Sequence, residues 1–379
     1  MKIKVWDYLD EYEAEREDIL AGIEKVMRSG RLILGESVKN FETAFAAYCG
    51  TAYGIGVDNA TNGLFLALKA LGIGPGDEVI TVSNTAVPTV SAIRASGAMA
   101  RFVDIDPTTY LMDVNHLEAA ITEKTKCIMP VHLFGQCVDM QTVNQVAQCH
   151  GLKVVEDCSQ SHGAAQQGRK AGSMSDLSVF SFYPTKPLGG YGDGGMALTS
   201  DEKLEKKLRR LRFYGMDTTY YAEEDGYNSR LDELHAEILL RKLKRLDEYI
   251  ARRRSLAQRY DQLLQQTSLG LPRTAPGNFH VYYIYVARHP ERDRILAELA
   301  KRDIHVNVSY PWPIHTMRGY AYLGYKEGDL PQTEKAAKEI FSLPMYPSLP
   351  EDALVQTCAA LGEILGEKVS LPEPQLAMA

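Results

Sequence analysis

Two stretches decide the fold prediction for this chain: LKVVEDCSQSHGAA at residues 152–165 and LSVFSFYPTKPLGGYGDGGMALT at residues 177–199. Each opens with a short apolar run typical of a buried strand and then turns to small or polar residues. Asp157 ends the first run, and Lys186 follows the second in a loop with two prolines. Because parallel sheets bind ligands outside the carboxyl ends of their strands, both side chains are candidates for a functional site.

The same alternation of apolar runs and amphipathic segments continues outward from these two stretches. Helical spacing at residues 63–71, 87–95, 115–121 and 141–150 predicts helices between strands. We therefore predict an α/β fold with a mainly parallel central sheet and helices on both of its faces. The further strand-like runs lie at residues 53–57, 78–83, 99–105, 126–134 and 194–199.

The character of the sequence changes after residue 200. Residues 231–266 predict one long charged helix, and a Pro/Gly-rich connector follows at 269–278. Residues 282–311 then predict a strand, a helix and a second strand. We expect an N-terminal arm with a large domain over residues 1–250 and a small C-terminal α/β domain over residues 251–379.

Composition excludes several classes of protein. The chain has 379 residues, 45 % hydrophobic and 24 % charged, and a formal net charge of −7. This is typical of a globular protein without a basic surface, so we predict no nucleic-acid partner. No leader-like segment and no run of about 18 apolar residues is seen, which predicts a cytoplasmic protein without a membrane span. The six cysteines fit no zinc spacing, so we predict reduced thiols and no metal site.

The third feature, in addition to Asp157 and Lys186, is a predicted helix N-terminus. After the run at 53–57, the residues NATNG (59–63) lead into a helix near Thr61, and the free N–H groups of a helix N-terminus bind phosphate. Singly, these residues could be a helix cap, a loop ligand and a surface charge. Together, on successive strand ends, they predict a pyridoxal 5′-phosphate (PLP) site. Lys186 would form the Schiff base, and Asp157 would pair with the protonated ring nitrogen.

Two neighbouring patterns do not change this interpretation. Gly190, Gly192 and Gly195 spell GxGxxG, but they lead into a strand rather than a helix, so we predict no dinucleotide site. Glu156 adjoins Asp157, but adjacent strand residues point to opposite faces, so the two carboxylates are not expected to act as a pair.

The chain resembles the DegT/StrS-type sugar aminotransferases, which are fold type I PLP enzymes. The resemblance covers nearly the whole chain, and the retained Lys186 distinguishes it from relatives that carry histidine there and act as sugar dehydratases. It rests on the ordered blocks GRLILGESVKNFETAFAAYCG (30–50), ALGIGPGDEVI (70–80), PVHLFGQCVDM (130–140), VVEDCSQSHGAA (154–165), FSFYPTKPLGGYGDGG (180–195), GYNSRLDELHAEILLRKL (226–243), VNVSYPWPIH (306–315) and FSLPMYP (341–347).

The resemblance implies a role for each site residue. Lys186 and Asp157 would be catalytic, with Lys186 also carrying the proton between the substrate carbon and the cofactor. It further implies a homodimer with shared active sites, in which Asn228 reaches the phosphate from the neighbouring subunit. The other implied cofactor-binding residues are Ala60, Thr61, Ala86, Ser159, Gln160 and Ser181. Candidate substrate residues are Tyr183, Tyr310, Trp312 and His315.

The implied reaction has two halves. L-Glutamate would give its amino group to PLP, and the pyridoxamine 5′-phosphate form would then aminate a keto group of a nucleotide-linked deoxysugar. Many relatives carry a ring-stacking aromatic residue where this chain has Ala86 in TAVPT (85–89). That block is similar to the 3-ketosugar aminotransferases, which favours a 3-keto over a 4-keto substrate. The alternatives are amination of a keto-cyclitol and a non-catalytic PLP-binding regulator.

Overall fold

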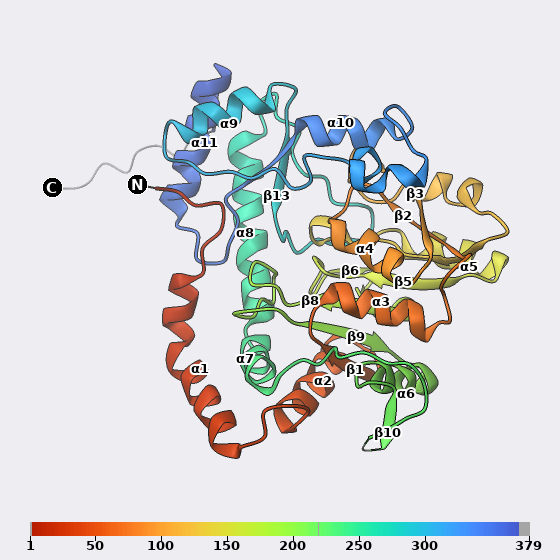
Figure 1. Cartoon of the computed structure of the whole chain (residues 1–379). Helices are drawn as coiled ribbons and strands as arrows, with labels where there is room; N and C mark the ends of the chain where they lie inside the picture. Colours follow the sequence, from red (N-terminus) through yellow and green to blue (C-terminus); the bar gives the residue numbers. More distant parts are fainter. Residues whose placement is uncertain (1, 219, 371–379) are drawn as a thin grey trace.

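A computed structural model describes residues 2–218 and 220–370 of the chain (Figure 1). Within these ranges, no helix has both the length and the apolar character needed to cross a bilayer. The helices are α1 Leu9–Ser29, α2 Glu36–Cys49, α3 Ala60–Ala70, α4 Val87–Ala95, α5 Met140–His150, α6 Glu202–Leu211, α7 Glu233–Leu243, α8 Leu246–Leu264, α9 Arg292–Ala300, α10 Pro331–Glu339 and α11 Glu351–Leu365. The strands are β1 Tyr53–Val57, β2 Glu78–Val82, β3 Met99–Val103, β4 Thr125–Ile128, β5 Lys153–Asp157, β6 Ala165–Gln166, β7 Arg169–Lys170, β8 Leu177–Ser181, β9 Gly195–Thr199, β10 Met216–Thr218, β11 Tyr221–Ala222, β12 Asn278–Phe279, β13 Tyr285–Arg288 and β14 Ile340–Leu343.

A seven-stranded sheet forms the centre of the molecule, with strand order β1-β9-β8-β5-β4-β2-β3. Strand β9 runs antiparallel to both of its neighbours, and the other paired strands are parallel. Each apolar run between residues 53 and 199 contributes one of these strands. The prediction of an α/β fold with a mainly parallel sheet is therefore confirmed. Of the helices expected between them, the one at residues 115–121 is replaced by two short 3-10 turns, Val114–His116 and Glu118–Ala120.

The two faces of the sheet bury different sets of side chains. On β5, Val155 packs with the core beneath α3, α4 and α6, whereas Val154 packs with the core beneath α2, α5 and α7. On β8, Val179 and Phe180 divide in the same way. Strands of a doubly covered sheet need apolar residues on both faces, which explains the continuous runs in the sequence.

Helix α8 contributes to two cores. Leu246 and Ile250, near its start, pack with the sheet core, whereas Tyr260 and Leu264 pack with a C-terminal core built from α8, α9, α11, β13 and β14. Ile3 of the N-terminal arm also joins this C-terminal core. The domain boundary near residue 250 falls inside α8 and stays a prediction.

Two details of the C-terminal half differ from the sequence prediction. The expected long helix is broken at Lys244 and Arg245 into α7 and α8, which Figure 1 shows running in different directions. The break lets α7 cover the sheet while α8 continues into the C-terminal core. The second strand expected within residues 282–311 is reduced to two isolated bridges, from Ile304 to Ile3 and from Asn307 to Ser342.

A buried ion pair holds the end of β1. The Nη1 atom of Arg212 donates to Glu42 Oε1 at 2.5 Å and to the carbonyl oxygen of Gly56 at 2.7 Å. Glu42 Oε1 also accepts from the Gly56 amide at 2.8 Å. Both side chains are buried, so Arg212 fixes the strand that leads to the loop at Asn59.

Candidate active site

A cavity of about 480 Å³ lies at the carboxyl ends of the central strands. Its walls come from the start of α3, the loop after β2, the end of β5 and the loop after β8. The cavity brings together residues that the sequence analysis singled out from separate blocks. These are Ala60, Thr61, Ala86, Asp157, Ser159, Gln160, Ser181, Tyr183 and Lys186.

Asp157 is the last residue of β5 and is only 4 % exposed. Its Oδ1 accepts from the Ser159 hydroxyl at 2.6 Å and from the Ser159 amide at 3.2 Å. Its Oδ2 accepts from the Thr89 hydroxyl at 2.8 Å. These contacts on both oxygens fix the orientation of the Asp157 carboxylate in the cavity wall.

Lys186 lies in a tight loop between β8 and β9. The Gly190 amide donates to the Phe182 carbonyl at 2.8 Å and closes this loop. A Cβ atom at Gly189 would collide with the Pro184 carbonyl oxygen, so the close turn requires glycine there. The Nζ atom of Lys186 lies 4.7 Å from the centre of the Tyr283 ring, and this aromatic face supports the amine.

The opposite end of the cavity is the N-terminus of α3. The Asn59 side chain caps this helix by accepting from the Asn62 amide at 2.9 Å. The cap leaves the amides of Ala60 and Thr61, in the first turn, for a ligand. A Cβ atom at Gly195 would lie 2.8 Å from the Ala60 nitrogen, so glycine is needed for β9 to pass this close.

Gln160 links the cavity to a distant part of the chain. Its Oε1 accepts from the Phe134 amide at 2.9 Å, and its Nε2 donates to the Tyr310 hydroxyl at 2.6 Å. Phe134 and Tyr310 both have positive φ angles, of 60° and 71°. Such strained backbone persists only where the surroundings impose it. Tyr310 is therefore held beside Gln160, at the edge of the predicted cofactor site.

Four of the predicted residues lie outside the wall of this cavity, among them Tyr310, which contacts Gln160. Trp312 and His315 line a second cavity of about 420 Å³. Trp312 is 70 % exposed, whereas the His315 ring is buried between the Ser83 hydroxyl, at 2.8 Å, and Glu334, at 3.1 Å. Asn228 is exposed and is not part of the wall of the first cavity.

Comparison with known proteins identifies the family of this chain. Residues 13–362 match the model of the DegT/DnrJ/EryC1/StrS aminotransferase family. The chain belongs to this family of PLP-dependent enzymes. The resemblance inferred from the sequence blocks is thereby confirmed.

Individual members of the family are similar over almost their whole length. A dTDP-3-amino-3,4,6-trideoxy-alpha-D-glucose transaminase of Micromonospora megalomicea is 56 % identical over 96 % of this chain and 99 % of its own. A pleiotropic regulatory protein of Geobacillus stearothermophilus is 45 % identical over 93 % of this chain and 95 % of its own. The crystal structure of Streptomyces venezuelae DesV with a ketimine intermediate is 40 % identical and has a TM-score of 0.94, covering 96 % of this chain and 98 % of DesV.

Several polar side chains near the predicted site of this family member were missed from the sequence, among them Thr89 and Tyr283. Thr89 contacts Asp157, and Tyr283 faces Lys186 and shares a 3.0 Å hydrogen bond with the Thr185 hydroxyl. The spacing of Thr85 and Thr89 in TAVPT would have suggested that both hydroxyls share one side of a helical turn. No local signal connects Tyr283 with Lys186, because the two lie far apart in the chain.

Within the described residues, neither ring nitrogen of His162 has a hydrogen-bond partner. Its ring packs against Phe45, Phe180 and Phe182. Burial, together with the nearby Lys186 cation, lowers the pKa of His162 to about 3, so the ring is neutral near pH 7. His162 is therefore a residue of the aromatic core.

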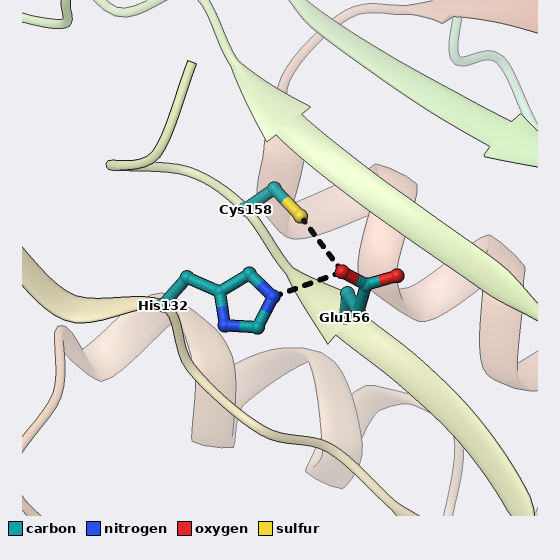
Figure 2. A group of neighbouring side chains, drawn as sticks. All are labelled: His132, Glu156 and Cys158. Atoms are coloured by element: carbon teal, nitrogen blue, oxygen red, sulfur yellow. Dashed lines mark hydrogen bonds and ion pairs between the residues drawn. The ribbon is translucent and has the colours of Figure 1, made fainter. Parts of the chain in front are cut away.

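Glu156 points to the opposite face of β5 from Asp157, as expected, and joins the buried group in Figure 2 with His132 and Cys158. Histidine, glutamate and cysteine are side chains of the kinds that can bind a metal ion. The sequence did not suggest this group, because His132 lies on a different segment from Glu156 and Cys158. His132 Nε2 lies 2.9 Å from Glu156 Oε2, and His132 Nδ1 accepts from the Val138 amide at 3.1 Å. Burial raises the pKa of the Cys158 thiol well above its usual value, so it stays protonated.

The Glu156 carboxylate also binds residues 172–175, which precede β8. It accepts from the amides of Gly172 and Met174, both at 2.9 Å, and from the Ser175 hydroxyl at 2.7 Å. Since these donors and His132 occupy both carboxylate oxygens, the cluster serves as a structural anchor for the strand end that carries Asp157.

This anchor predicts a loss of stability in Glu156→Gln. Burial raises the pKa of Glu156, but the His132 contact and the backbone donors outweigh burial and hold the pKa below its usual value of 4.5. We expect the variant to lose about 2–4 kcal/mol of unfolding free energy at pH 7. Because the carboxylate stabilises the fold only while ionised, the difference from wild type should shrink below about pH 4.5. Urea unfolding at several pH values measures both effects.

Glu118→Gln is the matched control for this experiment. Glu118 also contacts a histidine, His150, at 3.0 Å, but its side chain is 71 % exposed. This variant should change the unfolding free energy by less than about 1 kcal/mol. Equal losses in the two variants would contradict the anchoring role of Glu156.

Proposed function

We propose that this protein is an aminotransferase that moves an amino group from L-glutamate to a keto group of a nucleotide-linked deoxysugar, with PLP as cofactor. The observation that carries the proposal is the shared cavity of Lys186, Asp157 and the first turn of α3. An amine, a carboxylate and a phosphate-binding helix end are the three groups that PLP requires from a protein of this class. The cavity volume of about 480 Å³ also lies within the usual range for cofactor sites.

The residues of the cavity divide into holding and reacting groups. When bound, PLP supplies an electron sink that stabilises negative charge on the substrate carbon. The amides of Ala60 and Thr61, with Ser181, would hold the phosphate. Asp157 would keep a proton on the ring nitrogen. Ala86, Ser159 and Gln160 would bound the ring on its two faces and its edge.

Lys186 Nζ is the proposed base and acid of both half-reactions. It would take the proton from the donor carbon in the first half and return a proton to the acceptor carbon in the second. Tyr283 supports the amine through its ring face, 4.7 Å away. Tyr183, which is 53 % exposed at the mouth of the cavity, and Tyr310 are the proposed first contacts of the sugar.

A 3-keto position is favoured over a 4-keto position. The relative that is 56 % identical carries the name of a 3-amino sugar transaminase. The small Ala86 side chain leaves room at the ring face where many relatives have an aromatic residue. Together these support a substrate in which the carbon at position 3 of the sugar faces Lys186.

A panel of keto-sugar nucleotides tests the proposed substrate. The pyridoxamine form is prepared with L-glutamate, freed of glutamate and mixed with dTDP- and UDP-linked 3-keto and 4-keto deoxysugars or with a keto-cyclitol. We expect a 3-keto deoxysugar nucleotide to restore the PLP absorbance at least about tenfold faster than its 4-keto isomer. Faster recovery with the cyclitol or the 4-keto sugar would reject this substrate assignment.

The second candidate function is that of a PLP-binding regulator without turnover, because the chain is also similar to a pleiotropic regulatory protein. A PLP-binding regulator and an aminotransferase share the cofactor absorbance band. Only the enzyme loses that band when L-glutamate is added, because only the enzyme transfers the amino group. A band that persists at saturating glutamate would favour the regulator.

Substitution of the reactive amine should abolish turnover without removing the cofactor. We expect Lys186→Ala to lower the rate by more than about 10³-fold, since the same amine is the Schiff-base partner and the proton carrier. Borohydride treatment should attach the cofactor to wild type but not to the variant, as mass spectrometry would reveal. Lys206→Ala, at an exposed lysine of α6 paired with Glu202, serves as the control. Wild-type turnover in Lys186→Ala would contradict the assignment.

The proposed biological unit is a homodimer with shared active sites. Asn228 lies outside the wall of its own cavity and is exposed, so a second copy could place it at the phosphate of the neighbouring site.

The six cysteines are all free thiols, which supports a reducing compartment such as the cytoplasm.

Hybrid dimers test the sharing of residues between subunits. Mixed and reassorted, inactive Lys186→Ala and Asn228→Ala dimers form hybrids in which one site carries both substitutions and the other carries neither. We expect the mixture to recover about a quarter of the wild-type rate, because half of the dimers gain one intact site. No recovery, with subunit exchange verified by mass, would mean that Asn228 acts within its own subunit. An active Asn228→Ala dimer would mean that Asn228 has no role in the reaction.

A further inference from the structure

The Asp157 carboxylate is held by hydroxyl groups on both of its oxygens. Ser159, two residues further along the chain, binds Oδ1 through its hydroxyl and amide. Thr89 binds Oδ2 at 2.8 Å from a different element, the first turn of α4. Thr89 is 1 % exposed and Asp157 is 4 % exposed. Water therefore competes little for this contact, which increases its strength.

A second hydroxyl stands behind Thr89. The Thr85 Oγ1 atom lies 3.0 Å from the Thr89 Oγ1 atom, and Thr85 is 2 % exposed. A threonine hydroxyl has one hydrogen, and the hydrogen of Thr89 is committed to the carboxylate, which has none to give. Thr85 is therefore the donor to Thr89. The two hydroxyls form a directed chain that ends on Asp157.

We propose that Thr89, supported by Thr85, is a positioning residue that orients the Asp157 carboxylate toward the cofactor ring nitrogen. This inference rests on the proposed role of Asp157. With Oδ2 fixed by Thr89 and Oδ1 by Ser159, the carboxylate cannot rotate without breaking a buried hydrogen bond. Its remaining lone pairs then face the cavity, where an N–H group of a ring can meet them.

The contact is not explained by the needs of helix α4 alone. Buried threonines in this protein also bond to nearby carbonyl oxygens, as Thr357 does with Ala353 at 2.8 Å. The Thr89 amide already donates to the Ala86 carbonyl at 3.2 Å and closes the first turn of the helix. The hydroxyl of Thr89 is free from that turn and is directed across to β5.

Thr89→Val tests the proposal, because valine keeps the shape of threonine and removes the hydroxyl. With glutamate, we expect the maximal rate of the first half-reaction to fall about 10- to 100-fold while the KM for glutamate changes little. Thr89→Ser, which keeps a hydroxyl, should recover most of this rate. Thr357→Val removes a buried hydroxyl far from the cavity and should leave the rate unchanged.

The absorbance of the cofactor-loaded protein provides a readout besides rate. A positive ring nitrogen disfavours a proton on the nearby Schiff-base nitrogen. If Asp157 is less well oriented, the ring nitrogen holds its proton less firmly. The pH midpoint of the Schiff-base band should therefore move upward in Thr89→Val and return toward wild type in Thr89→Ser. A thermal unfolding scan checks that each variant is folded.

The results distinguish a failure of the Thr89 inference from a failure of the proposed active site. If Asp157→Asn lowers the rate severely while Thr89→Val shifts neither the rate nor the pH midpoint, Thr89 has no positioning role and the site assignment stands. If Asp157→Asn also has no effect on the glutamate half-reaction, the proposed role of Asp157 is itself rejected. A rate loss in Thr89→Val without any change in the pH midpoint would overturn positioning and leave only a structural effect.

Discussion

The parallel pairing of β5 with β8 is the constraint on which the rest of the structure depends. Asp157 lies opposite Val179, and beyond it the Cys158 amide donates to the Val179 carbonyl at 2.8 Å. This register ends both strands at the same edge of the sheet, so that the loop with Lys186 leaves β8 close to the carboxylate. A one-residue slip would turn Asp157 into the core and direct Glu156 to the cavity. The different hydrogen-bond partners of the two carboxylates oppose such a slip.

Much of the central fold was predictable because its signals are local. Each strand is a continuous apolar run, and the two candidate reactive residues lie at the end of β5 and a few residues after β8. Parallel topology then brings strand ends together, which is why Asp157, Lys186 and Thr61 could be grouped without knowledge of the structure. Other site residues, such as Ser181 at the end of β8 and Gln160 after β5, came from the family resemblance.

The features that escaped prediction depend on tertiary packing. The turn at Lys244 and Arg245 contains neither glycine nor proline, and it occurs where the chain leaves one core for another. Tyr283 meets Lys186 only because the C-terminal half folds back on the sheet. His132 reaches Glu156 through a loop whose residue Phe134 has a positive φ angle. None of these leaves a periodic pattern in the sequence.

Helix α8 constrains how the two halves of the molecule can move relative to each other. A hinge requires a few residues that change backbone angles freely, whereas α8 is continuous from Leu246 to Leu264 and is embedded at its two ends in different cores. Bending it would break helical hydrogen bonds. Helix α8 therefore opposes a hinge within residues 246–264, and the side chains packed at its two ends limit sliding of either core along it.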